Sequence, residues 1–160
     1  MNRPFRAATR ISRWLTVAVL LPIASFSAWP QAHTRQVGIY SLRSSTTNSE
    51  NLSEETAKAH GIGRDARRAV LNVVVLKNEV GLDTTVRAQM QAYATNLAGQ
   101  LKAIDMRPVA DSSRISYLGS YGFVHGEVLD FTIKAKPEGS GETLSMTYRE
   151  RLWVPGLPAQ

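Results

Sequence analysis

The residues that could carry catalytic or metal chemistry are few. The chain has three histidines, His33, His60 and His125, and no cysteine. His125 and Glu127 are two residues apart and would lie on one face of a strand, but a zinc site needs three or four ligands. The nucleophile motifs G-x-S-x-G and S-x-x-K are absent from the sequence. We therefore predict no catalytic residue, no metal site and no cofactor, and the sequence favours a protein that is not an enzyme.

Five polar or aromatic side chains are instead candidates for binding: Arg64, Asn72, Asn96, Gln100 and Trp153. Asn72 is the most informative of them because it interrupts an apolar run. A buried amide must find hydrogen-bond partners or cost about 1–3 kcal/mol. Asn72 would either bond a neighbouring loop and tie down the turn at 64–68, or contact a ligand at the mouth of a pocket.

The other four candidates also have two interpretations each. Arg64 is one of three arginines in the turn at 64–68, which would either hold a carboxylate or phosphate or be solvated. Asn96 and Gln100 flank a glycine turn, where they would bond the local backbone or a ligand. Trp153 shares the parity of the arginines in the last expected strand, so an exposed Trp153 would mark a contact surface.

The N-terminus has the layout of a secretory signal peptide. Four arginines and no acid precede Trp14, an apolar run occupies 15–26, and small residues follow. The run is shorter than the roughly 20 residues of a membrane-spanning helix. We predict a signal peptide at 1–27, cut after Ser27 or near Ala32, with an uncleaved anchor as the alternative. The mature protein would be periplasmic, exported by the general secretory route, with no transmembrane span.

That cleavage changes the charge balance. The whole chain has 19 basic and 13 acidic residues and a net charge of +6. Residues 1–27 hold four of the basic residues and no acid, so the mature chain has 15 against 13, or +2. A nucleic-acid-binding domain keeps its basic patch in the folded part, so we predict no nucleic-acid partner. The mature 28–160 is long enough for one domain with its own core, at about 36–154, and it has no disulfide.

Period-two alternation predicts about seven strands and one short helix. The expected strands are 36–43, 69–77, 84–97, 101–107, 114–123, 126–134 and 143–154. The helix near residues 53–60 would begin at Ser53, which caps the amide of Thr56, and end at Gly61. The segment 44–51 reads as a polar loop, and His33 falls in an unstructured leader.

These elements predict an all-β protein, a mainly antiparallel and immunoglobulin-like β-sandwich. The run 69–77 is β-branched and apolar on both faces, so we expect it to be a central strand. The segment 84–97 alternates as a strand does, although its Ala, Gln and Met residues also suit a helix. A helix there would give a curved sheet packed on a longer helix instead.

The residues also resemble those of a known family. The resemblance lies in the segments 52–64, 71–73, 96–101, 117–119, 127–131 and 136–139. Together they are similar to the proteobacterial domain-of-unknown-function family 4426, over roughly 37–154. The chain departs from the family pattern at His60, Glu54, Asp65 and 152–153, and in a longer loop at 44–51. The resemblance implies a small exported protein with a sandwich-like fold, and it supplies no activity.

Two classes of function follow from these features. The first is a non-enzymatic interaction module of the periplasm that binds an envelope protein or a peptide, for example by strand addition to an open sheet edge. The second is a small-ligand carrier or an enzyme with a polar pocket near Arg64, Asn72 and Asn96. A deep pocket lined by these three polar residues would favour the second class.

Overall fold

The computed structural model describes residues 32–158, so the predicted signal peptide at 1–27 lies outside the described residues. The described part contains ten strands, a short 3-10 helix and one α-helix. The strands are β1 (Ala32–Val37), β2 (Tyr40–Asn48), β3 (Arg68–Glu79), β4 (Leu82–Thr85), β5 (Ala88–Asn96), β6 (Leu101–Ile104), β7 (Arg107–Asp111), β8 (Arg114–Gly122), β9 (Val128–Pro137) and β10 (Leu144–Arg151). The helices are η1 (Ser49–Asn51) and α1 (Glu54–Ala59).

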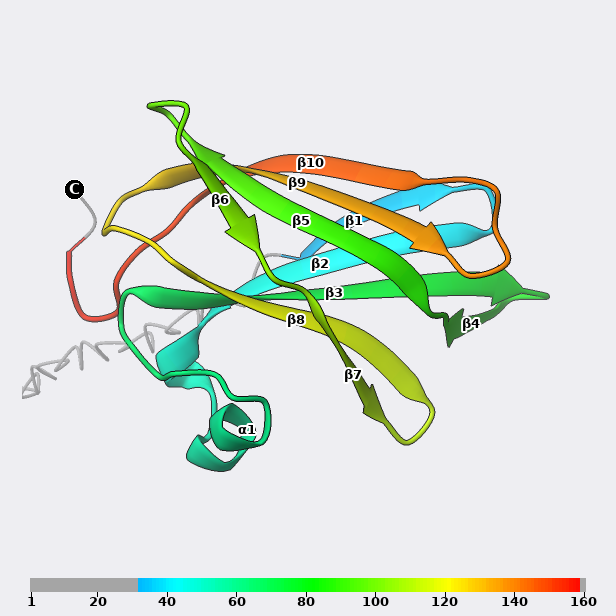
Figure 1. Ribbon diagram of the computed structural model, residues 1–160, viewed down its shortest axis with the longest axis horizontal. Coiled ribbons are helices and arrows are strands. Elements are labelled where there is room, and N and C mark those ends of the chain that lie inside the picture. The colour runs from blue at the N-terminus through cyan, green and yellow to red at the C-terminus, as the bar shows by residue number, and fades with distance from the viewer. Residues whose placement is uncertain (1–31, 159–160) are drawn as a thin grey trace, which may run out of the picture.

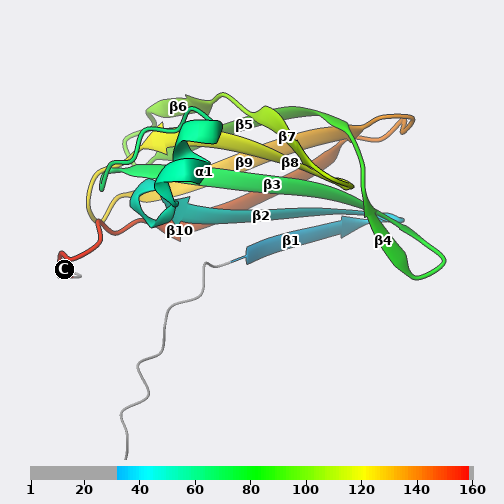
Figure 2. The ribbon, with the colours of Figure 1, turned by 90° about the horizontal axis from the view of Figure 1, so that it is seen from below.

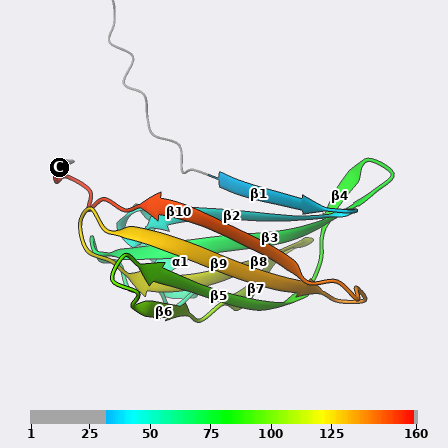
Figure 3. The same cartoon turned by 90° about the horizontal axis from the view of Figure 1, so that it is seen from above.

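The strands form two antiparallel sheets that face each other (Figure 1). Sheet A has the order β1-β2-β3-β8-β7, with β4 paired to the far end of β3. Sheet B has the order β10-β9-β5-β6. Seen from above, sheet B carries no helix on its outer face (Figure 3). The expected all-β sandwich is therefore confirmed, with ten strands in place of about seven.

Alternate residues of both sheets fill the space between them. Sheet A contributes Leu71, Val73 and Val75 from β3, and sheet B contributes Phe131 and Ile133 from β9; all five side chains are fully buried. Tyr117 joins the sheets, since its hydroxyl accepts from the Ala88 amide at 2.6 Å and donates to the Ala88 carbonyl at 2.9 Å. The central strand predicted at 69–77 is confirmed as β3, between β2 and β8.

The predicted helix is also confirmed. α1 follows Ser53, whose side chain accepts from the Thr56 amide at 3.1 Å. Gly61, with φ of 63°, lies in the turn after the helix, where a residue without a Cβ is favoured. The segment 84–97 is extended, as the alternation indicated, but it divides into β4 and β5, which belong to different sheets.

Three expectations about the N-terminal third are wrong. The segment 36–43 is not one strand: Gly38, with φ of 56°, begins the two-residue turn that joins β1 to β2. The segment 44–51 is not a loop either, because 44–48 continue β2 and pair with β3. His33 therefore does not lie in a leader; it lies in β1, where its ring stacks on Tyr148 at 3.7 Å.

Candidate functional site

The predicted binding residues are not gathered in one place. Arg64 lies in the loop after α1, and its guanidinium donates to the Glu50 carbonyl at 2.8 Å. The turn at 64–68 is held by other residues: Asn48 donates to the Ala66 carbonyl at 2.7 Å, and the buried Ser49 hydroxyl bonds the backbone of Asp65. Asn72 does not tie down this turn, so that interpretation of Asn72 is wrong.

Asn96 and Gln100 organise the turn between β5 and β6. The Asn96 carboxamide oxygen accepts from the amides of Ala98 and Gln100 at 3.1 and 2.9 Å, and its nitrogen donates to the Gln100 side chain at 2.8 Å. Gly99 has φ of 77°, which this turn requires. Asn96 belongs to sheet B, whereas Asn72 lies on the outer face of sheet A, so the two residues do not line a common pocket.

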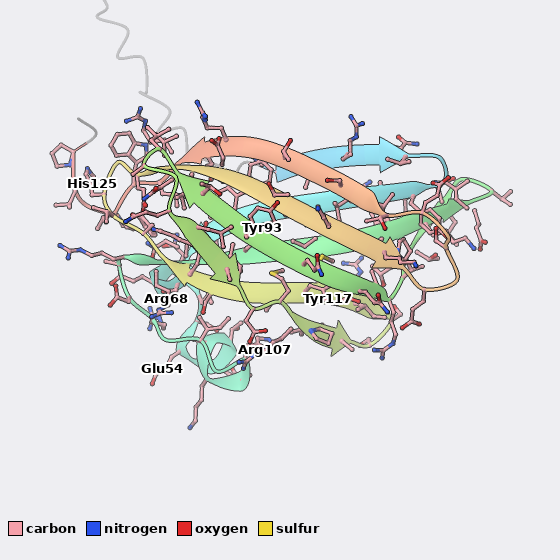
Figure 4. The ribbon with its side chains drawn as sticks, turned by 45° about the horizontal axis from the view of Figure 1, so that its top comes forward. Glu54, Arg68, Tyr93, Arg107, Tyr117 and His125 are labelled. Atoms are coloured by element: carbon pink, nitrogen blue, oxygen red, sulfur yellow. The ribbon has the colours of Figure 1, made fainter. Side chains whose placement is uncertain are left out.

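Trp153 lies after β10 at the end of the molecule that also carries His125 (Figure 4). The two rings meet edge-on with centroids 5.1 Å apart. The nitrogens of His125 bond the backbone, since Nδ1 accepts from the Val154 amide at 3.2 Å and Nε2 lies 2.9 Å from the Pro158 carbonyl. Glu127 accepts from Lys102 at 2.8 Å. His125 and Glu127 therefore have structural partners and form no common site.

Asn72 lines a hollow on the outer face of sheet A. On the outer face of sheet A, Asn72 has Ser45 of β2 and Leu118 of β8 as cross-strand neighbours. Its carboxamide oxygen is buried and has no hydrogen-bond partner among the described residues. A buried acceptor without a donor costs free energy, so an N–H or O–H group that reached this oxygen would relieve that cost.

We call this hollow the outer groove. It lies on the outer face of sheet A, and Figure 2 shows α1 and β4 toward opposite ends of that sheet. Its larger section has a volume of about 860 Å³, and a second section of about 480 Å³ adjoins the C-terminal end of α1. Both sections include Val109 of β7. Figure 4 shows Arg107 of β7 beside α1, at the second section.

The floor of the outer groove is apolar and its rim is polar. Val74, Leu76 and Val109 line the larger section, and Leu118 lines the second. Hydroxyl groups surround the apolar part: Ser45, Thr85, Ser113 and Ser116. The Arg43 guanidinium lies 3.1 Å from the Asp83 carboxylate at one wall. A floor of this kind suits a ligand with alternating apolar and hydrogen-bonding groups.

The outer face of sheet B is different. Its β5 and β9 positions are occupied by Gln91, Tyr93, Thr132 and Lys134, and Figure 4 labels Tyr93 over this sheet. None of these four residues is buried. A polar, solvated outer face is ordinary for an antiparallel sheet, so the apolar floor on sheet A is the exceptional surface of this sandwich.

A second polar group of residues lies inside the sandwich, where β2 meets β10. The hydroxyl of the buried Ser44 donates to the Tyr148 hydroxyl at 3.1 Å. Burial raises the pKa of Tyr148 to about 12, although the hydrogen bond with Ser44 lowers it in part, and burial also raises the pKa of the Glu150 carboxyl. Sequence reasoning missed Glu150, although it has the parity of Leu144, Met146 and Tyr148, the inward-facing residues of β10.

The Glu150 carboxyl predicts a pH dependence of stability. A carboxyl whose pKa is higher in the folded than in the unfolded protein stabilises most below the unfolded pKa, and this contribution is lost as pH rises through the folded pKa. Glu150→Gln removes that loss. We therefore expect E150Q to gain stability over the wild type as pH rises from about 4 to about 8, measured by urea unfolding. Glu142→Gln, at an exposed loop position, is the control; an equal gain in both variants would contradict the prediction.

The geometry defines a class of protein, a two-sheet antiparallel β-sandwich with an open, half-apolar groove on one outer face. The sequence then places it in a family: the chain belongs to the family described as "Domain of unknown function (DUF4426)", whose profile matches residues 34–155. The comparison with curated proteins finds no match. Within residues 32–158, no helix is long and apolar enough to cross a membrane.

Solved structures share the fold. A DUF4426 family protein from Pseudomonas aeruginosa PAO1 is 23% identical, with a TM-score of 0.69 over 77% of this chain and 95% of its own. FetP of uropathogenic Escherichia coli strain F11, expressed in the periplasm, is 9% identical, with a TM-score of 0.57 over 78% of this chain and 95% of its own. A copper-bound variant of FetP is 11% identical, with a TM-score of 0.56 over 82% and 98%.

At 9–11% sequence identity, the likeness to FetP is a likeness of fold. Between residues 32 and 158, no three His, Asp or Glu side chains come together to hold a metal ion. A divalent metal bound by side chains typically needs three or more such ligands.

Proposed function

We propose that this protein is an exported, non-enzymatic binding module of the periplasm whose outer groove binds an extended polypeptide segment of an envelope protein. Its export is supported by the predicted signal peptide at 1–27. The observation that carries the proposal is the apolar floor of the outer groove beside the unpartnered oxygen of Asn72.

The dimensions of the groove suit an extended chain. From Asn72 through Val74 to Leu76, β3 presents three outward side chains to the groove. At about 3.3 Å per residue this floor is about 13 Å long, the length of about four extended residues. In an extended segment every second side chain points the same way. Apolar side chains at those positions would lie on Val74, Leu76 and Val109, and a backbone N–H group would donate to Asn72 Oδ1.

The alternative pocket around Arg64, Asn72 and Asn96 has less support. Asn72 lines the outer groove, but Arg64 donates to a loop carbonyl and Asn96 caps a turn of sheet B. These three residues do not converge on one small molecule. Asn72 therefore stays in the proposed site, whereas Arg64, Asn96, Gln100 and Trp153 do not belong to the outer groove.

Photocrosslinking in living cells tests the proposal. A photoreactive residue at Ser116, on the rim of the groove, should give adducts with a protein or peptide that mass spectrometry identifies. The same residue at Lys134, on the outer face of sheet B, is the matched control. Val74→Arg places a long charged side chain on the apolar floor, so we expect it to reduce the Ser116 adduct roughly tenfold or more, as a loss of about 1.4 kcal/mol or more would.

Each result of the crosslinking experiment either supports the proposal or overturns it. An adduct at Ser116 that is absent at Lys134 and lost in V74R supports the proposal, provided that V74R retains the urea midpoint of the wild type within error. Equal adducts at both positions, or none at Ser116 from exported protein, overturn it. Cell fractionation and N-terminal sequencing of the same sample test export and show whether the cut follows Ser27 or lies near Ala32.

A further inference from the structure

A small cavity opens on the side of the sandwich where β2 and β10 end. Its volume is about 160 Å³. Thr46, Ala69 and Phe123, all buried, line it together with Glu150, and Arg151 and Trp153 also contribute to its lining. We call it the seam socket, because it lies where β2 of sheet A meets β10 of sheet B. It is separate from the outer groove, which lies on the other face of sheet A.

The seam socket contains a carboxylate that has no partner. Among the described residues, Glu150 Oε2 is buried and accepts no hydrogen bond. The same is true of the Thr46 hydroxyl, which lines the socket, and the Tyr121 hydroxyl is another buried oxygen without a partner. Thr46 and Glu150 lie side by side in the lining of the socket. Buried oxygens that lack donors, one of them a carboxylate, suit a cation that donates hydrogen bonds.

The socket also presents an aromatic ring to positive charge. The Arg151 guanidinium lies 5.7 Å from the centroid of the Trp153 ring, within the range of a cation–π contact. The Trp153 ring is also contacted by His125, which meets it edge-on. The chain's own arginine therefore already uses this ring as a cation contact.

We propose that the seam socket binds one compact organic cation, an ammonium or guanidinium group, with Glu150 as its counter-ion, Thr46 as a further acceptor and Trp153 as its aromatic contact. At about 30 Å³ per water in the liquid, 160 Å³ accommodates about five waters or a cationic group of similar size. An anion is disfavoured by Glu150, and a purely apolar group would leave the buried oxygens without donors. Arg151 competes with the bound cation for Trp153 and is displaced from it.

Binding is tested with n-propylammonium chloride and with a blocked lysine tripeptide, each titrated into the exported protein at constant ionic strength. The readout is the indole N–H resonance of Trp153, assigned with Trp153→Phe, together with the amide resonances of Thr46 and Glu150. We expect a saturable shift at these positions. Glu150→Gln should weaken binding about tenfold or more, because a charge-assisted hydrogen bond is lost, and Glu142→Gln should leave it unchanged.

A second variant is expected to strengthen binding, whereas Glu150→Gln is expected to weaken it. Arg151→Ala removes the competing guanidinium, so we expect it to strengthen cation binding several-fold, whereas a weak non-specific association would not respond in this way. Affinity should also fall as acid protonates Glu150. Binding of the free amine alone identifies a small soluble cation as the ligand, and binding of the tripeptide identifies a lysine side chain of a partner. No saturable shift, or equal affinities in E150Q and E142Q, overturns the proposal.

Discussion

Phe131→Ala is expected to lower the free energy of unfolding by about 4 kcal/mol. Phe131 is fully buried between the sheets. Its ring stacks on Tyr148 with centroids 5.0 Å apart and meets Tyr121 edge-on at 5.5 Å. Alanine would remove the apolar area of the ring, leave a cavity and abolish both aromatic contacts, which contribute about 0.5–1.5 kcal/mol each. Urea unfolding followed by far-UV circular dichroism measures the loss.

Phe131→Leu is the matched control. Leucine fills most of the volume of the ring and makes no aromatic pair, so its cost should be about 1–2 kcal/mol. Domains of this size have free energies of unfolding of about 5–15 kcal/mol, and a loss of about 4 kcal/mol is a large share of that total. Both variants should therefore be compared at low temperature, where they stay folded. A loss below about 1 kcal/mol for Phe131→Ala would contradict the packing of Phe131 at the centre of the core.

The strands that the sequence predicts best are those whose inward residues are apolar. β9 alternates Leu129, Phe131 and Ile133 inward with polar residues outward, and the alternation located it. The same alternation did not locate β2 correctly, because Ser44 and Thr46 point inward and are buried although they are polar. These hydroxyls face the polar group around Tyr148 and Glu150, so the reason for their burial lies in a strand about a hundred residues further along the chain.

The division of 84–97 into two strands could not be predicted from local sequence. Neither glycine nor proline marks the boundary at 86–87, where the chain leaves sheet A and enters sheet B. The change is fixed by distant partners: the Val86 amide donates to the Val75 carbonyl at 3.0 Å, and Tyr117 bonds the backbone of Ala88. Contacts of this kind connect residues that no short window contains.

The candidate site was predictable in part. Asn72 was a candidate because it is a polar residue in an apolar strand, and the structure places it in the outer groove. Its apolar neighbours Val109 and Leu118 come from β7 and β8, and only the sheet order brings them beside β3. The sequence also indicates Glu150 as a buried carboxyl, because this acid has the same parity as the apolar, inward-facing residues of β10. A charged residue at an inward-facing position of a strand is therefore as informative about a candidate site as a polar residue in an apolar run.

Gly119→Ala is expected to lower the free energy of unfolding by about 2–3 kcal/mol. A Cβ at this position of β8 would lie 2.5 Å from Ile104 Cγ2, 2.6 Å from Met106 Sδ and 3.0 Å from the Asp105 carbonyl. The two side chains have some freedom to move, but the carbonyl belongs to the backbone that crosses from β6 in sheet B to β7 in sheet A. The crossing must therefore shift, and overpacking of this kind costs about 1–3 kcal/mol.

Gly122→Ala is the matched control in the same strand, since its Cβ would meet only the Arg67 carbonyl at 3.9 Å. We expect it to change stability by less than about 0.5 kcal/mol in urea unfolding. The comparison also bears on the outer groove, because β7 follows the crossing and carries Val109 into the groove floor. Gly119→Ala should therefore weaken the crosslink from Ser116, whereas Gly122→Ala should preserve it. Equal stability of the two variants would mean that β8 does not approach the crossing as closely as these distances require.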